Sequence, residues 1–215
     1  MIEKHNGLIH GQQKIIVIVG PTASGKSDLA LRLAKLIQGK QFKKMGINGA
    51  EIISADSRQV YRGMDIGTGK VAKKEQKIVK HHLLDVCSPK KIFTAENFKN
   101  LGEKAIKEIS ARNKIPIIVG GTGFYIDILL GRMSTAPVPP NPKLRAKLEE
   151  QTAEQLYSRL LALDFQRAQS IDRHNKRHLI RAIEIVISTG KPVPIYNLKP
   201  KTYNILWIGL SPGGL

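Results

Sequence analysis

Apolar residues upstream of Gly131 come in short unbroken runs that alternate with amphipathic stretches. Ile15 to Val19 is a run of β-branched residues that ends at Gly20, which is typical of a buried parallel strand. Similar runs predict strands at 51–54, 82–86 and 115–119. Apolar residues recur with helical spacing in Ser27 to Ile37 and after Thr94, a residue suited to capping a helix. This alternation predicts an α/β fold with a doubly wound parallel sheet.

The pattern changes after Gly131, where a proline-rich segment begins. Residues 136–142 contain four prolines and predict a rigid linker. Beyond it, the sequence predicts helices at 142–150, 152–161 and 174–189, and a final strand at 203–210. We therefore divide the chain into an α/β core (1–133), a small helical insertion (134–190) and a strand that returns to the core (191–215). Residues 40–49 are polar and glycine-containing and predict a surface excursion within the core.

Composition adds a charge signal. Lys and Arg total 35 against 17 Asp and Glu, a formal net charge of +18. This excess favours a polyanionic partner, nucleic acid first, although a solvated lysine-rich surface gives the same count. Cys87 is the only cysteine, so no intramolecular disulfide can form. Residues 1–13 lack an apolar signal core, and no run approaches the roughly 18 apolar residues of a membrane span. These features predict a cytoplasmic protein.

A phosphate-binding motif, G-x-x-x-x-G-K-[ST], lies between the first predicted strand and helix. Its residues are Gly20, Pro21, Thr22, Ala23, Ser24, Gly25, Lys26 and Ser27. The glycines let backbone N–H groups face phosphate oxygens, and the helix N-terminus adds a partial positive charge. Lys26 is predicted to hold the terminal phosphate and the Ser27 hydroxyl to ligate Mg²⁺. The motif predicts a P-loop that binds a di- or triphosphate, and it leaves open which bond is broken.

The position of acidic residues bears on that bond. An ATPase or kinase usually carries an acid at the end of an apolar strand to hold Mg²⁺. The strand predicted to end at Val119 continues into Gly-Gly-Thr-Gly, whereas Asp56 and Asp85 accompany two other predicted strands. A phosphotransferase acting on a small acceptor therefore stays open at this point.

Three further segments favour a different chemistry. The stretch from Asp56 to Lys70 places an acid, an amide, hydroxyls and two arginines directly after a predicted strand, where parallel sheets bind ligands. With D-S-x-Q-x-Y in this stretch, H-H-L-L-D at 81–85 and G-G-T-G-F-Y at 120–125, the sequence resembles tRNA dimethylallyltransferases, in which these motifs follow a P-loop in this order. The segment 203–210 resembles that family's next core strand, so the resemblance runs from about Lys14 to Leu210.

The resemblance implies a P-loop NTPase-like fold and a prenyl transfer. A dimethylallyl group would pass from dimethylallyl diphosphate to N6 of the adenosine beside the 3′ end of a tRNA anticodon, with release of diphosphate and with Mg²⁺ as cofactor. The implied catalytic residues are Asp56 as general base, Thr122 beside the reacting amine, and Lys26 at the leaving group. The residues implied in tRNA binding are Asp56, Ser57, Arg58, Gln59, Thr122, Arg177 and Arg181, and Gln59 would position the flipped-out base.

The helix predicted at 174–189 separates its residues by chemistry. Its basic stripe, with i, i+3, i+4 and i+7 spacing, consists of His174, Arg177, His178 and Arg181. Leu179, Ile183 and Val186 fall on the opposite side. The matching segment of the family contacts tRNA, whereas the simpler interpretation is a solvated charged face.

Simpler interpretations also exist for other site residues. Asp56 and Thr122 could each cap a following helix. His81 and His82 could suggest a metal pair, but adjacent side chains on a strand point to opposite faces. The glycines at 120, 121 and 123 could serve only a tight turn between strand and helix.

Two further alternatives to the tRNA enzyme stay open. An adenylate isopentenyltransferase would share the P-loop and the base but accept a free nucleotide, and a truncated tRNA-binding remnant would bind RNA without turnover. Family members continue past the strand at 203–210, whereas this sequence ends at Leu215. We therefore expect either a monomer whose substrate tunnel is open on one side or a core completed by a second chain.

Overall fold

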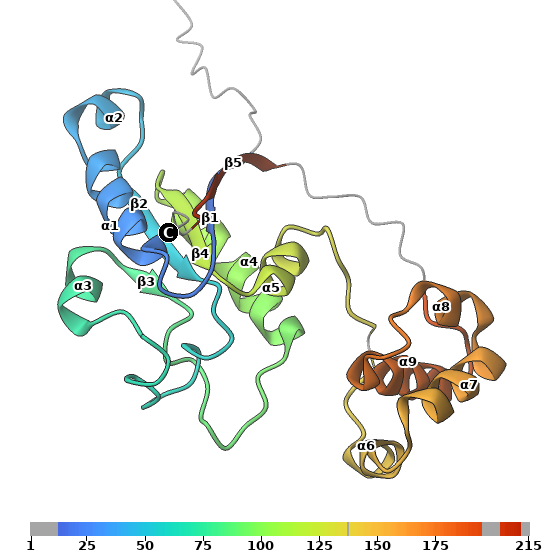
Figure 1. The fold of residues 1–215 in the computed structure, drawn as a ribbon. Coiled ribbons are helices and arrows are strands. Elements are labelled where there is room, and N and C mark those ends of the chain that lie inside the picture. Colours follow the sequence, from blue (N-terminus) through green and yellow to red (C-terminus); the bar gives the residue numbers. More distant parts are fainter. Residues whose placement is uncertain (1–12, 137, 195–202, 212–215) are drawn as a thin grey trace, which may run out of the picture. The chain divides into compact units, whose positions relative to one another are not determined.

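A parallel sheet forms the centre of the larger of two units in this protein (Figure 1). The computed structural model describes residues 13–136, 138–194 and 203–211. Its strands are β1 (Gln13–Val19), β2 (Ala50–Ser54), β3 (His81–His82), β4 (Ile115–Gly120) and β5 (Tyr203–Gly209). In the described residues their order is β3-β2-β4-β1-β5, and each neighbouring pair is parallel. The carboxyl ends therefore share one edge, where open α/β sheets bind ligands.

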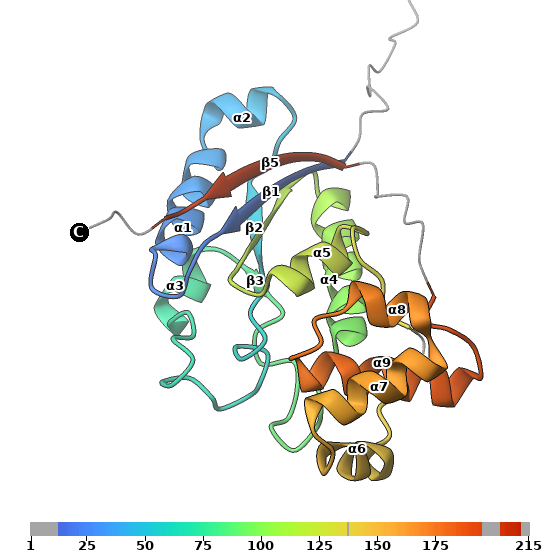
Figure 2. The same cartoon turned by 45° about the vertical axis from the view of Figure 1, so that its right-hand side comes forward.

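The apolar runs produce a sheet that is buried on both faces. In β1, Ile15 and Val17 pack with helices α4 (Ala95–Ala111) and α5 (Gly123–Leu129), whereas Ile16 and Ile18 pack with α1 (Lys26–Ile37). Figure 2 shows α1 on one side of the sheet and α4 and α5 on the other. Successive side chains of a strand point to opposite faces, so an unbroken apolar run feeds both cores. The doubly wound α/β fold is confirmed.

Helix starts follow the capping chemistry of the sequence in part. Thr94 caps α4, because its Oγ1 accepts a hydrogen bond from Asn97 N at 3.1 Å. Two short helices, α2 (Lys40–Lys44) and α3 (Lys73–Ile78), contain no buried residue. Hydrophobic periodicity therefore gives no signal for them, and α2 occupies the segment predicted as a surface excursion.

The prediction of a strand at 82–86 is wrong in its bounds. β3 contains only His81 and His82, because Leu83 (φ 63°) and Asp85 (φ 57°) adopt left-handed backbone conformations that end the extended segment. The two histidines have separate partners. His82 Nε2 lies 2.7 Å from Glu51 Oε2, and His81 Nδ1 lies 2.7 Å from the Val79 carbonyl oxygen.

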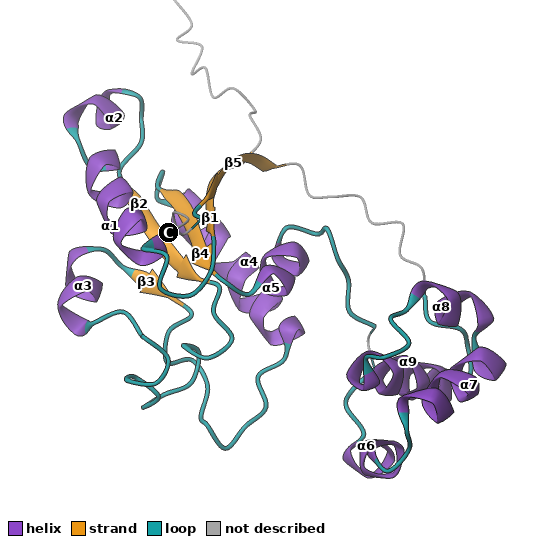
Figure 3. Cartoon of the chain, viewed as in Figure 1, coloured by secondary structure: helices purple, strands orange, loops and turns teal. Residues whose placement is uncertain are grey.

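The second unit consists of the described residues from Ser134 to 194 and contains helices only (Figure 3). These helices are α6 (Pro142–Glu149), α7 (Ala153–Leu163), α8 (Phe165–Ser170) and α9 (Lys176–Thr189). Leu148, Leu160 and Leu179 are fully buried in its core. The sequence did not predict α8, and α9 begins two residues later than predicted because Asn175 caps it. No helix in the described ranges is long and apolar enough to cross a membrane.

A buried carboxylate in α9 links this helix to the start of α6. Glu184 is 0% exposed and accepts hydrogen bonds from Arg145 Nη2 at 2.7 Å, Arg181 Nη1 at 2.5 Å and Asn141 N at 2.6 Å. Burial raises the pKa of Glu184, but these hydrogen bonds outweigh that effect and lower the pKa to about 2. The charged form is therefore the one that the fold stabilises.

We expect Glu184→Gln to destabilise the second unit by about 3 kcal/mol at neutral pH, because two arginines lose their buried counter-charge. A carboxylate with a depressed pKa stabilises the fold above its unfolded pKa, and this contribution disappears as pH falls from about 4.5 toward about 2. The glutamine variant should lack this acid-dependent loss. Hydrogen exchange of α9 amides in the full chain measures both effects, with the exposed Glu149→Gln as control. Equal protection of α9 in the two variants would contradict the structural role of Glu184.

Candidate active site

The P-loop connects β1 to α1 through left-handed backbone conformations. Ala23 has φ 62° and Gly25 has φ 82°, and a residue with a side chain, such as Ala23, rarely adopts this region. Helix α1 begins at Lys26, so the N–H groups of its first turn have no intrahelical acceptor and are available to an anion. This is the strand–loop–helix context that the motif requires.

Lys26 is folded onto its own loop. Its Nζ contacts the Pro21 carbonyl oxygen and lies 3.3 Å from Ser24 Oγ. Burial lowers the pKa of Lys26, while the nearby charge of Asp56 acts in the opposite direction. A phosphate would offer this ammonium a stronger, charged acceptor than a carbonyl or a hydroxyl does.

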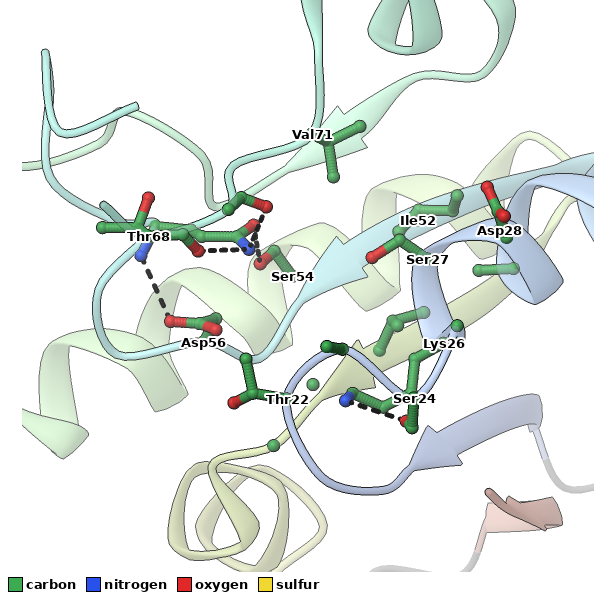
Figure 4. Close-up of a pocket in the computed structure, with 18 of the residues that line it drawn as sticks. Thr22, Ser24, Lys26, Ser27, Asp28, Ile52, Ser54, Asp56, Thr68 and Val71 are labelled. Atoms are coloured by element: carbon green, nitrogen blue, oxygen red, sulfur yellow. Dashed lines mark hydrogen bonds between the residues drawn. The ribbon is translucent and has the colours of Figure 1, made fainter. Parts of the chain in front are cut away.

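A cavity of about 410 Å³ lies at the carboxyl edge of the sheet. Figure 4 shows Thr22, Ser24 and Lys26 on one side of it and Asp56 and Thr68 on another. Its lining residues are Thr22, Ala23, Ser24, Gly25, Lys26, Ser27, Asp28, Ala30, Ile52, Ser54, Asp56, Gln59, Thr68, Gly69, Val71, His81, Val119, Gly120 and Gly121. The structure thus brings residues 22–27 of the predicted diphosphate loop to one cavity with Asp56 and Gln59, whereas Gly20, Pro21 and Thr122 are not among the residues that line it.

Asp56 follows β2 and is half-buried. Its Oδ1 accepts hydrogen bonds from Arg58 N at 2.7 Å and from Gln59 N at 3.3 Å. The carboxylate therefore caps a turn at 57–60, and no helix begins there as the simpler interpretation of this residue would require. Both of its hydrogen bonds within the described residues use Oδ1, which leaves Oδ2 for a bound group.

Thr122, which follows β4, is hydrogen-bonded to the same turn. Thr122 Oγ1 accepts a hydrogen bond from Ser57 N at 3.2 Å, and Thr122 N donates to the Ala55 carbonyl oxygen at 3.3 Å. Thr122 is the N-cap residue of α5 but makes no side-chain capping hydrogen bond there. Its hydroxyl therefore supports the segment that carries Asp56, rather than the following helix.

Gln59 forms part of the cavity wall and is 9% exposed. Its Nε2 donates to the carbonyl oxygens of Thr68 at 3.4 Å and Gly69 at 3.3 Å, and its Oε1 accepts from Ser54 Oγ at 3.4 Å. These two carbonyl groups require donors, so they fix which end of the carboxamide is the nitrogen.

The residues present fit a Mg²⁺ ion of the P-loop type. The described residues contain no group of three or more His, Cys, Asp or Glu that could hold a metal. Mg²⁺ beside a P-loop needs few protein ligands, because phosphate oxygens and water fill most positions. The Ser27 side chain is exposed and lines the cavity next to Lys26, as a hydroxyl ligand in such a site must.

The family model for IPP transferase matches residues 59–214, which is most of the chain. The chain belongs to the IPP transferase family. Among curated relatives, this family member is similar to the tRNA dimethylallyltransferases of Roseiflexus sp. (strain RS-1), 42% identical over 202 residues, and of Finegoldia magna, 44% identical over 197 residues. These matches cover 92% and 90% of this chain but 63% and 59% of the relatives. The chain thus spans about three fifths of their length.

Solved structures give the same family. A full-length tRNA isopentenylpyrophosphate transferase from Bacillus halodurans is 35% identical, with a TM-score of 0.55, over 92% of this chain and 60% of its own. A eukaryotic dimethylallyltransferase acting on tRNA is 27% identical, with a TM-score of 0.72, over 92% of this chain and 48% of its own. The P-loop NTPase-like fold that the sequence predicts is therefore confirmed.

The predicted RNA contacts of this IPP transferase family member lie in both units. Arg58 is exposed beside a second hollow lined by residues 63–68, and Ser57 is half-buried. Arg177 is exposed on α9. Arg181 instead donates to Glu184 and to the carbonyl oxygens of Ala136 and Val138. Its observed partners give Arg181 a structural role, and RNA contact by any of these residues stays a prediction.

Sequence reasoning did not select some residues that line the cavity. Thr68 and Gly69 supply carbonyl groups to Gln59, and His81 contributes from β3. The first two lie in the distinctive stretch from Asp56 to Lys70. Their position in that stretch could have suggested a role at the site. Every residue has a backbone carbonyl group, however, so the residue types themselves did not indicate these contacts.

Proposed function

We propose that this chain transfers a dimethylallyl group from dimethylallyl diphosphate to N6 of the adenosine beside the tRNA anticodon, releasing diphosphate. The C–O bond between the dimethylallyl carbon and the diphosphate breaks, and its electron pair stays with the diphosphate. The N6 nitrogen forms the new bond to that carbon and loses one proton. The proposal is supported by the curated relatives that the chain resembles, which are named tRNA dimethylallyltransferase.

One observation carries the proposal. The P-loop residues 22–27 and the polar wall formed by Asp56 and Gln59 border a single cavity. A phosphotransferase would use the same P-loop, but the family of this chain and its named relatives favour dimethylallyl transfer. A free nucleotide is the less favoured acceptor, since the named relatives act on tRNA.

Lys26 and the loop backbone act on the leaving group. Cleavage places negative charge on the diphosphate, and the N–H groups at the start of α1 are fixed toward that position before reaction. Lys26 exchanges its contacts with Pro21 and Ser24 for the diphosphate oxygens. These donors stabilise the departing charge more than the bound substrate, which is the requirement for catalysis.

Asp56 acts on the nucleophile. Its Oδ1 is held by two backbone N–H groups, so the free Oδ2 has a defined position from which to accept the N6 proton. Thr122 fixes the same turn through Ser57. Gln59 faces the flipped-out adenine from the cavity wall.

The cofactor and the remaining partner surfaces belong to the same proposal. The Ser27 hydroxyl would hold Mg²⁺, which supplies charge neutralisation to the diphosphate when bound. Arg58 and Arg177, both exposed, would contact the phosphate backbone of the anticodon stem-loop. A cytoplasmic location, where a tRNA substrate is available, belongs to the same proposal.

A labelled transfer experiment with three acceptors tests the proposed function. The full chain is incubated with Mg²⁺, labelled dimethylallyl diphosphate, and either an anticodon stem-loop with the target adenosine, the same stem-loop with inosine, or AMP. We expect label only in the adenosine stem-loop, and loss of label on removal of Mg²⁺ by a chelator. Label in AMP alone would identify a free-nucleotide enzyme. A parallel incubation replaces dimethylallyl diphosphate with ATP. ATP consumption there, without prenyl transfer in the first incubation, would identify a phosphotransferase and contradict the proposal.

A further inference from the structure

Lys70 has an unusual environment for a lysine in a surface segment. Its side chain is 2% exposed, and its Nζ lies 2.7 Å from the Tyr61 carbonyl oxygen, 2.7 Å from Asp65 Oδ1 and 2.6 Å from Asp85 Oδ1. An ammonium group has three donors, and all three have acceptors here. Burial of a charge is unfavourable unless it is paired in this way, so the arrangement specifies the position of the segment.

These contacts fasten the loop of residues 62–69 to the segment after β3. Asp65 belongs to the loop, whereas Asp85 follows β3. Arg62 adds two contacts of the same kind, from its Nε to the Asp85 carbonyl oxygen at 2.8 Å and from its N to the Cys87 carbonyl oxygen at 2.9 Å. Lys70, the residue that directly follows the loop, therefore fixes the end of the loop to Tyr61 and Asp85.

The fastened loop determines how Gln59 presents its carboxamide. The carbonyl groups of Thr68 and Gly69, the two residues before Lys70, accept both hydrogen bonds from Gln59 Nε2 at 3.4 and 3.3 Å. Such long hydrogen bonds depend on the carbonyl groups being held in place. With both N–H groups engaged, the one hydrogen-bonding capacity left to the carboxamide is the second lone pair of Oε1. Gln59 thus offers the cavity an acceptor.

We propose that Lys70 is a positioning residue that makes the cavity select a 6-amino purine over a 6-oxo purine, by holding the loop that orients Gln59. The proposal rests on the proposed function, in which adenine enters this cavity. The N6–H of adenine donates to Gln59 Oε1, whereas the O6 of a 6-oxo purine faces it with a second acceptor. A site built to satisfy a donor rejects an analogue that lacks it, because the buried polar group is left unpaired.

The test compares Lys70→Met with Lys73→Met. Lys73 Nζ lies 3.5 Å from the other oxygen of Asp85, but its side chain is 76% exposed, so it is a matched control. Binding is measured with the adenosine and inosine stem-loops, and transfer with the adenosine stem-loop, since inosine lacks the N6 amine that accepts the prenyl group. We expect Lys70→Met to reduce the preference for binding the adenosine over the inosine stem-loop by about tenfold. The kcat for transfer to the adenosine stem-loop should fall by about 10- to 100-fold. The KM for dimethylallyl diphosphate should stay near that of the wild type, since the P-loop is unchanged.

A double-mutant cycle separates positioning from general damage. If Lys70 acts through Gln59, Lys70→Met should change selectivity little in a Gln59→Ala background. Where Lys70→Met does not fold, Asp65→Asn removes one ion pair from a carboxylate that is 59% exposed and should show a smaller loss of the same preference.

The outcomes distinguish two failures. A wild type that binds neither stem-loop overturns the proposed function and the selection that rests on it. A wild type that prefers adenosine, with Lys70→Met keeping that preference and a kcat equal to that of Lys73→Met, overturns the role of Lys70 alone. If the wild type binds RNA without transfer, the binding ratio still decides the role of Lys70.

Discussion

Replacing Asp56 by asparagine should lower the rate of dimethylallyl transfer by about 10²- to 10⁴-fold, the range typical of a lost general base. Asparagine keeps an oxygen that can accept the hydrogen bonds from Arg58 N and Gln59 N, so the turn after β2 should persist. Its amide nitrogen replaces the oxygen that would take the N6 proton. The variant should therefore bind both substrates and fail at the chemical step.

Single-turnover transfer with saturating substrates isolates that step from binding and product release. Asp28 offers a matched control, because it also lines the cavity but lies on α1 (Figure 4). We expect Asp28→Asn to retain far more activity than Asp56→Asn. If Asp56→Asn transfers the prenyl group as fast as the wild type, another group takes the proton and the assigned role of Asp56 is wrong.

The second large effect concerns the contact between two strand ends. A Cβ on Gly120 would lie 2.1 Å from the Ala55 carbonyl oxygen and 2.4 Å from its carbon. Both atoms belong to the backbone that precedes Asp56, and β2 pairs with β4 up to Ser54 and Val119. The neighbour cannot rotate away as a side chain would. We expect Gly120→Ala to destabilise the α/β unit by about 3 kcal/mol. The substitution should also displace Asp56, so that the molecules that remain folded transfer the prenyl group more slowly than the wild type.

Gly123→Ala is the control for this substitution. A Cβ on Gly123 has no atom within 4 Å, and Gly123 is the first residue of α5, where alanine is a better helix former than glycine. Trp207 in β5, the only tryptophan of the chain, reports unfolding of the sheet. Urea midpoints measured by its fluorescence should fall for Gly120→Ala and stay or rise for Gly123→Ala. Equal urea midpoints for the two variants would show that the backbone at Ala55 moves away from a Cβ at position 120 without loss of stability.

The parts of the fold that rest on local patterns could be predicted. The β-branched run at 15–19 is β1, the glycine-rich turn after it is the P-loop, and Thr94 caps α4. Each follows from the chemistry of a few adjacent residues. β3 was predicted too long because left-handed backbone at Leu83 and Asp85 does not appear in a hydrophobicity pattern. The helices α2 and α3 bury no side chain and so produce no periodic signal.

Several roles at the site could not be predicted, because they depend on hydrogen bonds between residues that are distant in the sequence. Helical spacing placed Arg181 on a basic stripe, yet its guanidinium bonds the carbonyl oxygens of Ala136 and Val138. Lys70 appeared as one lysine among many, yet Asp85 accepts its hydrogen bond. A sequence shows which groups are present, whereas the fold decides which of them remain available to a ligand.

The proposed reaction is tested most directly by identifying the RNA product of the wild-type chain. The adenosine stem-loop, Mg²⁺ and labelled dimethylallyl diphosphate are combined, and the RNA is then digested to nucleosides and analysed by mass spectrometry. We predict a single modified nucleoside, the target adenosine with the dimethylallyl group on N6, together with an equal amount of diphosphate. Unmodified adenosine in a stem-loop that demonstrably binds beside bound dimethylallyl diphosphate would contradict the proposal and leave a chain that binds tRNA without turnover.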